Sequence, residues 1–148
     1  ILRSSLPGYA SLAVFPYEKE EIVAICKPDH PLMQKGDILD IAQLADYPLA
    51  VPFDCLDLVR SSFGHRLLAP NISIITSSNA TAIEWARSFG TVALASLTTA
   101  DFQHIKDLAV KHFSDDNLFI TSAFIVNKEY PLSRAARNFL GFHGVDVG

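Results

Sequence analysis

The chain has 148 residues, of which 49% are hydrophobic and 19% charged, and this predicts one globular domain or two small lobes sharing a chain. Its net charge of -4 and a pI near 5.6 argue against a nucleic-acid-binding surface, which is normally basic. No apolar run reaches the length that is needed to cross a bilayer.

The first third of the chain predicts two strands, an extended connection and a short helix. Residues 11–15 should form a short strand ended by a proline, and residues 21–26 form a strand that is apolar on both faces. The prolines within residues 28–32 favour an extended connection. Asp40 is expected to cap a short helix that ends before the next proline.

The middle of the chain repeats a pattern of strand, loop and helix. Strands are expected at residues 48–51, 71–76 and 91–95, with one helix over residues 56–67 and another from the end of the 77–79 loop to about residue 89. Short apolar strands that alternate with helices of about ten residues are typical of right-handed βαβ units on a parallel sheet.

Both helices of this middle segment show an apolar face at helical spacing. The first is expected to begin after an Asp54 cap, and the second after Ser78 or Asn79, with Gly90 at its end. The face of the first helix carries Leu56, Val59, Phe63 and Leu67. The face of the second carries Ala82, Trp85, Ala86 and Phe89.

The last third predicts two strands and a helix. Residues 107–113 and 118–126 should be strands separated by a turn at residues 114–117. Ser133 is the expected cap of the final helix. The residues on its inward face are Leu132, Ala136, Phe139, Leu140 and His143.

No short pattern indicates a metal site or a cofactor. None of the five histidines has a metal-ligand spacing, and the glycines form no phosphate-binding loop. Cys26 and Cys55 are expected to be reduced thiols. Cys55 lies near a predicted helix start, a setting that favours a thiolate, so a cysteine enzyme remains an alternative to a small apolar loop residue.

The loops after the three parallel strands are expected at one edge of the sheet. They cover residues 52–55, 77–79 and 96–99, and ligands of open α/β sheets bind beyond the carboxyl ends of the strands. These loops contain no Lys or Arg but offer hydroxyls, an amide and N–H groups at helix starts. They predict a binding site for a small organic acid or a similar polar metabolite.

Four segments in this order resemble the effector-binding domain of LysR-type transcriptional regulators. They are the Pro-Asp-His-Pro-Leu crossover at residues 28–32, the Ile-Ala-Gln-Leu-Ala-Asp-Tyr-Pro helix at residues 41–48, the helix-to-strand segment at residues 88–94, and the Leu-Ser-Arg-Ala-Ala-Arg-Asn-Phe-Leu helix at residues 132–140. The chain departs from the family pattern at Ser88, where the family has a glycine, and after the third strand, where the usual proline is absent.

The resemblance implies an α/β, periplasmic-binding-protein-like fold with two lobes around mixed, mostly parallel sheets. Residues 1–32 would form part of lobe one, residues 33–117 a complete lobe two, and residues 118–148 the return strand and helix of lobe one. Lobe one is expected to be incomplete, since the family's domain begins well before Ile1.

In this family the effector sits between the lobes and shifts their arrangement. The resemblance places eight residues on the lobe-two side of the site: Pro52, Phe53, Asp54, Ser77, Ser78, Asn79, Ser96 and Leu97. It implies a cytoplasmic homodimer without enzymatic activity, cofactor, metal or membrane contact, which reaches DNA only through a helix-turn-helix domain absent from this chain. The alternatives are a transport-type solute-binding protein on the same fold and a small enzyme that uses Cys55.

Overall fold

The computed structural model describes residues 2–3, 10–98 and 101–148. The chain divides into two compact units, one made of Ile1–Lys19 with Thr121–Gly148 and the other of Glu20–Ile120. We call them unit 1 and unit 2. Two strands, β2 (Leu12–Cys26) and β8 (Phe119–Asn127), have residues in both units. The predicted lobes, at residues 1–32, 33–117 and 118–148, remain a prediction.

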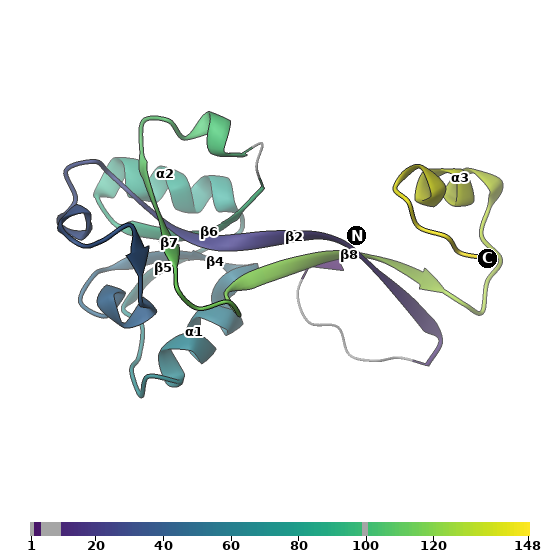
Figure 1. Cartoon of the computed structure of the whole chain (residues 1–148), viewed down its shortest axis with the longest axis horizontal. Coiled ribbons are helices and arrows are strands. Elements are labelled where there is room, and N and C mark those ends of the chain that lie inside the picture. Colours follow the sequence, from purple (N-terminus) through teal and green to yellow (C-terminus); the bar gives the residue numbers. More distant parts are fainter. Residues whose placement is uncertain (1, 4–9, 99–100) are drawn as a thin grey trace. The chain divides into compact units, whose positions relative to one another are not determined.

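Three parallel strands form the centre of unit 2 (Figure 1). β4 (Leu49–Pro52) pairs in parallel with β5 (Ile72–Thr76) on one side and with β6 (Val92–Leu97) on the other. β6 also pairs antiparallel with β2. This arrangement confirms the mixed, mostly parallel sheet that the sequence predicts.

Two helices connect the parallel strands and cover opposite faces of the sheet (Figure 1). α1 (Leu56–Gly64) follows β4, and α2 (Asn79–Phe89) follows β5. Alternate residues of β2 belong to different apolar clusters, since Ile22 packs on the α1 side and Val23 on the α2 side. This alternation is the period of two that a strand buried on both faces requires.

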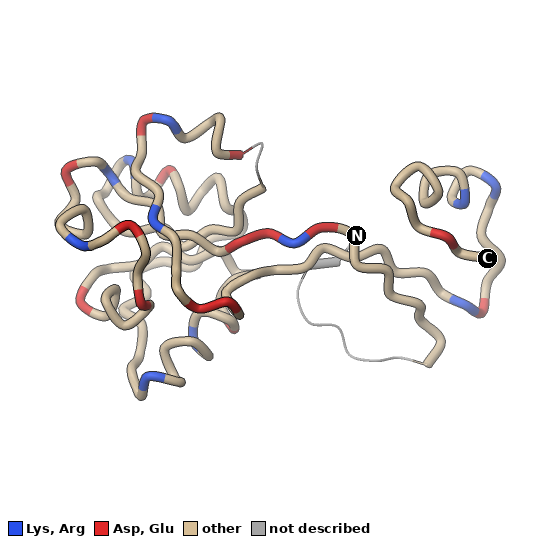
Figure 2. Tube along the Cα trace, viewed as in Figure 1, with Lys and Arg blue, Asp and Glu red and all other residues tan. Residues whose placement is uncertain are grey.

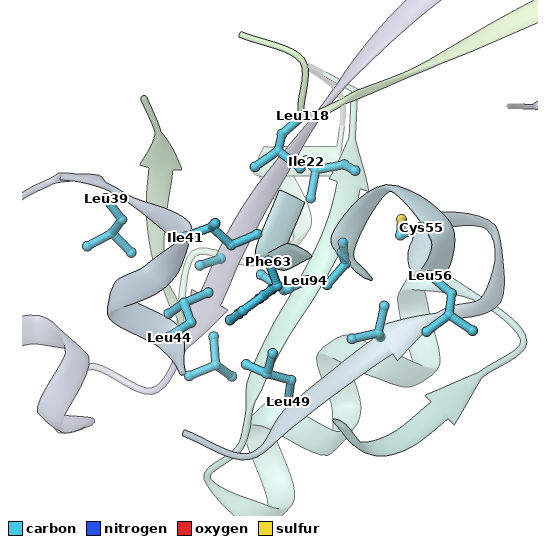
Figure 3. Close-up of a cluster of buried hydrophobic side chains, with 14 of the residues drawn as sticks. Ile22, Leu39, Ile41, Leu44, Leu49, Cys55, Leu56, Phe63, Leu94 and Leu118 are labelled. Atoms are coloured by element: carbon cyan, nitrogen blue, oxygen red, sulfur yellow. The ribbon is translucent and has the colours of Figure 1, made fainter. Parts of the chain in front are cut away.

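The cluster on the α1 side surrounds Phe63, which is fully buried. Figure 3 shows its ring among Leu44, Leu49 and Leu94, which come from three different elements. The predicted inward residues Leu56, Val59 and Phe63 of this helix are all buried. Most of the largest fully buried side chains of unit 2 therefore lie on this face of the sheet.

The cluster on the α2 side is built from smaller side chains. Ala82 and Ala86 are fully buried, as predicted. Phe89, however, is 66% exposed, and Trp85 is only half-buried with its ring centroid 4.4 Å from that of Phe89. The prediction that Phe89 faces the core is therefore wrong, because α2 approaches the sheet through its alanines.

Shorter elements complete unit 2. β3 (Ile38–Leu39) pairs in parallel with β7 (Ala109–Phe113), which pairs antiparallel with β2. Four 3-10 helices are present in the described chain: η1 (Pro31–Gln34), η2 (Ile41–Leu44), η3 (Phe53–Cys55) and η4 (Asp101–His104). Asp40 caps η2 in a capping box with Gln43, which confirms the predicted cap.

Three local predictions were wrong. The two strands predicted at residues 11–15 and 21–26 are one continuous strand, β2, which begins at Leu12, because a proline ends a strand only where its missing N–H is needed. Asp54 does not cap α1, since η3 precedes that helix and Cys55 takes the cap position. α1 ends at Gly64, and Leu67 is 95% exposed with a φ of 56°.

Unit 1 contains β1 (Leu2–Arg3), which pairs antiparallel with β8, and α3 (Arg134–Phe142). Ser133 caps α3 by accepting a hydrogen bond from the Ala136 N–H, as predicted. The buried apolar cluster of this unit is small and consists of Phe124, Leu140 and Val145.

Candidate functional site

The loops that follow β4, β5 and β6 lie at one edge of the unit 2 sheet. β4 runs parallel to both neighbours, with Pro52 opposite Thr76 and Ala50 opposite Ala93. The three strands therefore end at the same edge, where the first residues of α2 also lie (Figure 1). The structure brings together residues 52–55, 77–79 and 96–98 of the three loops that the sequence analysis singled out, and residue 99 lies outside the described residues.

The eight predicted site residues differ in exposure. Phe53 is 73% exposed, and Ser77 and Ser78 are also exposed. Asp54 and Asn79 are half-buried. Three residues are buried: Pro52, Ser96 and Leu97. A ligand at this edge can therefore reach Phe53 and the serines directly, whereas Pro52, Ser96 and Leu97 are largely covered.

The start of α2 presents hydrogen-bond donors. Ser78 Oγ accepts the Thr81 N–H at 3.2 Å, and the Ser78 carbonyl accepts the Ala82 N–H at 3.2 Å. No acceptor among the described residues pairs with the N–H groups of Asn79 and Ala80. Free N–H groups and the helix dipole together favour an anion at such a position.

The side chain of Asn79 is engaged with the end of β6. Its Nδ2 donates to the Ser96 carbonyl at 2.7 Å, and its Oδ1 accepts the Ser96 N–H at 3.3 Å. The Ser96 hydroxyl in turn donates to Glu20 Oε2 at 2.9 Å. These bonds tie the second and third loops to each other and to β2.

Glu20 is the residue of this edge that the sequence analysis missed. It belongs to the charged stretch of residues 18–21, which Figure 2 shows within β2. Its side chain is nevertheless only 6% exposed, because it packs against Ser96. A run of charged residues normally indicates a solvated strand, and a partner 76 positions away leaves no local signal.

A pocket of about 250 Å³ lies between α2 and η4 and reaches the candidate edge. Its lining includes Asn79 and Leu97 of the candidate edge and the buried apolar side chains of Ile83 and Ile105. This pocket was not predicted from the sequence, since its two walls come from segments that are separated along the chain.

Neither cysteine offers an accessible nucleophile. Cys26 and Cys55 are both buried free thiols, and Cys55 Sγ donates to Asp54 Oδ1 at 3.6 Å. Burial raises the pKa of the Cys26 thiol. Among the described residues, no group of three or more His, Cys, Asp or Glu side chains could hold a metal ion. Nor does any described helix have the length and apolar character of a membrane span.

Loops at the carboxyl edge of a parallel sheet, in a unit that shares two strands with a second unit, define a ligand-binding domain of the periplasmic-binding-protein-like class. The family model of the LysR substrate binding domain matches residues 1–143, and the chain belongs to this family. Domains of this family are the small-molecule-sensing regulatory part of transcription regulators. The family predicted from the four sequence segments is thereby confirmed.

Solved structures share the fold at low sequence identity. The effector binding domain of QuiR in complex with shikimate is 19% identical, with a TM-score of 0.77 over 95% of this chain and 67% of that one. The regulatory domain of CcmR from Synechocystis PCC6803 in complex with 2-PG is 17% identical, with a TM-score of 0.75 over 95% and 70%. The C-terminal domain of a probable LysR family transcriptional regulator from Rhodococcus sp. RHA1 is 21% identical, with a TM-score of 0.74 over 95% and 71%. No curated protein matches the chain by sequence.

Proposed function

We propose that this chain binds a small organic acid, or a polar metabolite of similar size, at the carboxyl edge of the unit 2 sheet. The ligand would contact Phe53, Ser77, Ser78 and the start of α2, with Pro52, Asp54, Asn79, Ser96 and Leu97 completing this wall. Binding between two lobes would favour one lobe arrangement, which a helix-turn-helix domain outside this chain would convert into altered DNA binding.

The single observation that carries this proposal is the pair of N–H groups at Asn79 and Ala80. They point out of the first turn of α2 without an acceptor among the described residues, beside the exposed hydroxyls of Ser77 and Ser78. A carboxylate can satisfy these donors without an ion pair. QuiR in complex with shikimate supports the same ligand class on this fold.

Phe53 is the proposed apolar contact. Its side chain is 73% exposed at the end of β4, next to the polar wall. An exposed aromatic ring beside a few hydrogen-bond donors is the usual composition of a small-molecule site, in which apolar contact adds affinity and polar groups fix the orientation. The ligand is therefore expected to combine an acidic group with a carbon skeleton that can lie against this ring.

Ser78→Ala tests the wall, with Ser133→Ala as its matched control. Both serines cap a helix through the same kind of hydrogen bond, so both changes should cost similar stability. Only Ser78→Ala should weaken binding of shikimate or another small carboxylate in calorimetry, by about 0.5–1.5 kcal/mol for one lost hydrogen bond. Phe53→Ala should weaken it through lost contact area. Unchanged affinity in both folded variants would overturn the proposed site.

We further propose a cytoplasmic homodimer that neither catalyses a reaction nor binds DNA through this chain. The net charge of -4 opposes phosphate binding, and the burial of Cys55 opposes the cysteine-enzyme alternative. A gel shift at low salt should show no sequence-specific complex with this chain. Sedimentation at high concentration should show a dimer, and a stable monomer would contradict this part of the proposal.

A further inference from the structure

The Asn79 side chain replaces a missing strand partner at the end of β6. Ser96 lies opposite Ile22 of β2. The Ile22 N–H donates to the Leu118 carbonyl and is therefore not available to Ser96. The Ser96 N–H and carbonyl therefore face the other side, where β4 has ended at Pro52. A proline has no N–H to offer there, and the Asn79 amide takes the place of a backbone peptide with one donor and one acceptor.

The hydrogen bonds around Ser96 have a defined direction. Asn79 Nδ2 lies 3.3 Å from Ser96 Oγ and can only donate to it. The hydroxyl hydrogen is then directed to Glu20 Oε2, 2.9 Å away, where the carboxylate can only accept. Asn79, Ser96 and Glu20 form one chain of donors that ends on a buried carboxylate. We call these three residues the relay.

We infer that Glu20 is a positioning residue for the ligand wall, acting through Ser96 and Asn79. This inference rests on the proposed function, since it concerns the same wall. Asn79 is the first residue of α2, so holding its side chain fixes the position of the N–H groups of Asn79 and Ala80. Glu20 thereby influences ligand affinity from a site that the ligand does not touch.

The position of Glu20 also gives the relay a regulatory role. Glu20 is the first residue of unit 2 along β2, and Lys19 before it belongs to unit 1. A ligand that draws the start of α2 toward itself changes the Asn79–Ser96 bonds and, through the Ser96 hydroxyl, the bond to Glu20. Ligand binding at the start of α2 therefore affects Glu20, the residue at which β2 passes from unit 2 to unit 1.

Amide hydrogen exchange tests the relay without any ligand. Glu20→Ala should speed exchange of the residue 96 and Ala82 amides roughly fivefold, as the loss of one hydrogen bond predicts. Glu20→Gln keeps an acceptor for Ser96 and should restore rates close to those of the wild-type protein. If Glu20 acts through Asn79, Glu20→Ala combined with Asn79→Ala should exchange no faster at these amides than Asn79→Ala alone.

Two controls separate the relay from a general loss of stability. Exchange of the Val51 amide in β4 should stay at its wild-type rate in every variant, because that strand lies outside the relay. Thr91→Val removes a buried hydroxyl just before β6 that has no hydrogen-bond partner among the described residues, and it should leave the residue 96 amide unchanged. The inference would be overturned if Glu20→Ala sped exchange equally at all amides, Val51 included. It would also be overturned if the effects of Glu20→Ala and Asn79→Ala were fully additive in the double variant.

A ligand titration separates a failure of this inference from a failure of the proposed function. Titration with shikimate, followed through the Ala80 amide signal, should give a weaker dissociation constant in both Ser78→Ala and Glu20→Ala, with Glu20→Gln close to wild type. Weakening by Ser78→Ala alone would overturn the relay and leave the wall in place. A third outcome is that Glu20→Ala alters exchange but the Ala80 signal does not respond to shikimate. The relay would then be a structural link only, and the proposed ligand site would be wrong.

Discussion

Arg66 and Asp40 form a two-armed ion pair between the segment after α1 and the cap of η2. Arg66 Nε lies 3.1 Å from Asp40 Oδ1, and Arg66 Nη2 lies 3.1 Å from Asp40 Oδ2. Asp40 Oδ1 also accepts the Ala42 N–H at 2.9 Å. One carboxylate thus caps a 3-10 helix and anchors the end of an α-helix 26 positions away.

Asp40→Asn should therefore reduce stability at neutral pH more than at low pH. The hydrogen bond from Arg66, and then that from the Ala42 N–H, hold the pKa of Asp40 below its ordinary value. A carboxyl group with a lowered folded-state pKa contributes stability above its unfolded value of about 4, and this contribution is lost as the pH falls through the folded value. Urea unfolding at pH 7 and pH 3 measures the difference, which should shrink at pH 3.

Leu67→Gly should stabilise the protein. Leu67 has a φ of 56° and is 95% exposed, and the N–H groups of Leu67 and Leu68 bond back to Gly64 and Phe63 in a Schellman arrangement. Because the left-handed conformation costs a leucine about 1–2 kcal/mol, glycine should gain roughly 0.5–1 kcal/mol after its greater unfolded-state entropy is subtracted. Leu68→Gly is the control, and a loss of stability in Leu67→Gly would contradict this account.

Phe63→Ala and Phe89→Ala make the same chemical change in opposite environments. Phe63 is fully buried within the α1-side cluster, whereas Phe89 is 66% exposed at the end of α2. Phe63→Ala should cost about 3–5 kcal/mol through lost burial and a residual cavity. Phe89→Ala should cost less than about 1 kcal/mol, as exposed positions do. Denaturant unfolding compares them directly, and similar losses would mean that α2 is rotated about its axis.

The helices and strands of unit 2 could be predicted from sequence because their signals are local. Hydrophobic period, helix caps and the glycine after α2 act within a few residues, and Gly90 does take the left-handed conformation expected of it. Which residues of α2 face the sheet was harder to predict. Ala82 and Ala86 belong to one buried cluster with Ala93 and Ala95, whereas Trp85 is only half-buried and Phe89 is exposed.

In the candidate site, too, local features could be predicted from the sequence and long-range contacts could not. That three loops meet at one edge follows from parallel strand order and could be predicted. Which side chains remain exposed depends on partners far along the chain, as the hydrogen bond between Glu20 and Ser96 shows. Asn79 offers an amide in the sequence, but the structure commits that amide to Ser96. The local pattern identifies polar groups without telling whether another residue already satisfies them.

Lys111→Met should destabilise unit 2 although it removes a charge from a buried position. Lys111 is 3% exposed, and its Nζ donates to the Lys35 and Gly36 carbonyls at 2.8 and 3.1 Å. Methionine fills a similar volume but leaves both carbonyls without this donor, so a loss of about 1–3 kcal/mol is expected. The control is Lys106→Met at an exposed position, which should change stability by less than about 0.5 kcal/mol.

Thr91→Val should leave stability unchanged or raise it. The Thr91 hydroxyl is buried just before β6, without a hydrogen-bond partner among the described residues. Valine keeps the branched shape and removes the unsatisfied group, whose burial costs about 1–3 kcal/mol. Thermal unfolding checks the change, with Thr91→Ser, which keeps the hydroxyl, as the control. A lower melting temperature in Thr91→Val would show that the hydroxyl has a partner in solution.

The division of the chain between its two units has a consequence for biosynthesis. Unit 2 is one uninterrupted segment, Glu20–Ile120, whereas unit 1 is assembled from residues on both sides of it. A ribosome delivers the chain from its N-terminus, and domains generally fold as units during this delivery. Unit 2 can therefore close its core as soon as Ile120 has emerged, while unit 1 must wait for α3. A nascent chain arrested before α3 should thus already protect unit 2 from proteolysis and leave Leu12–Lys19 open to cleavage.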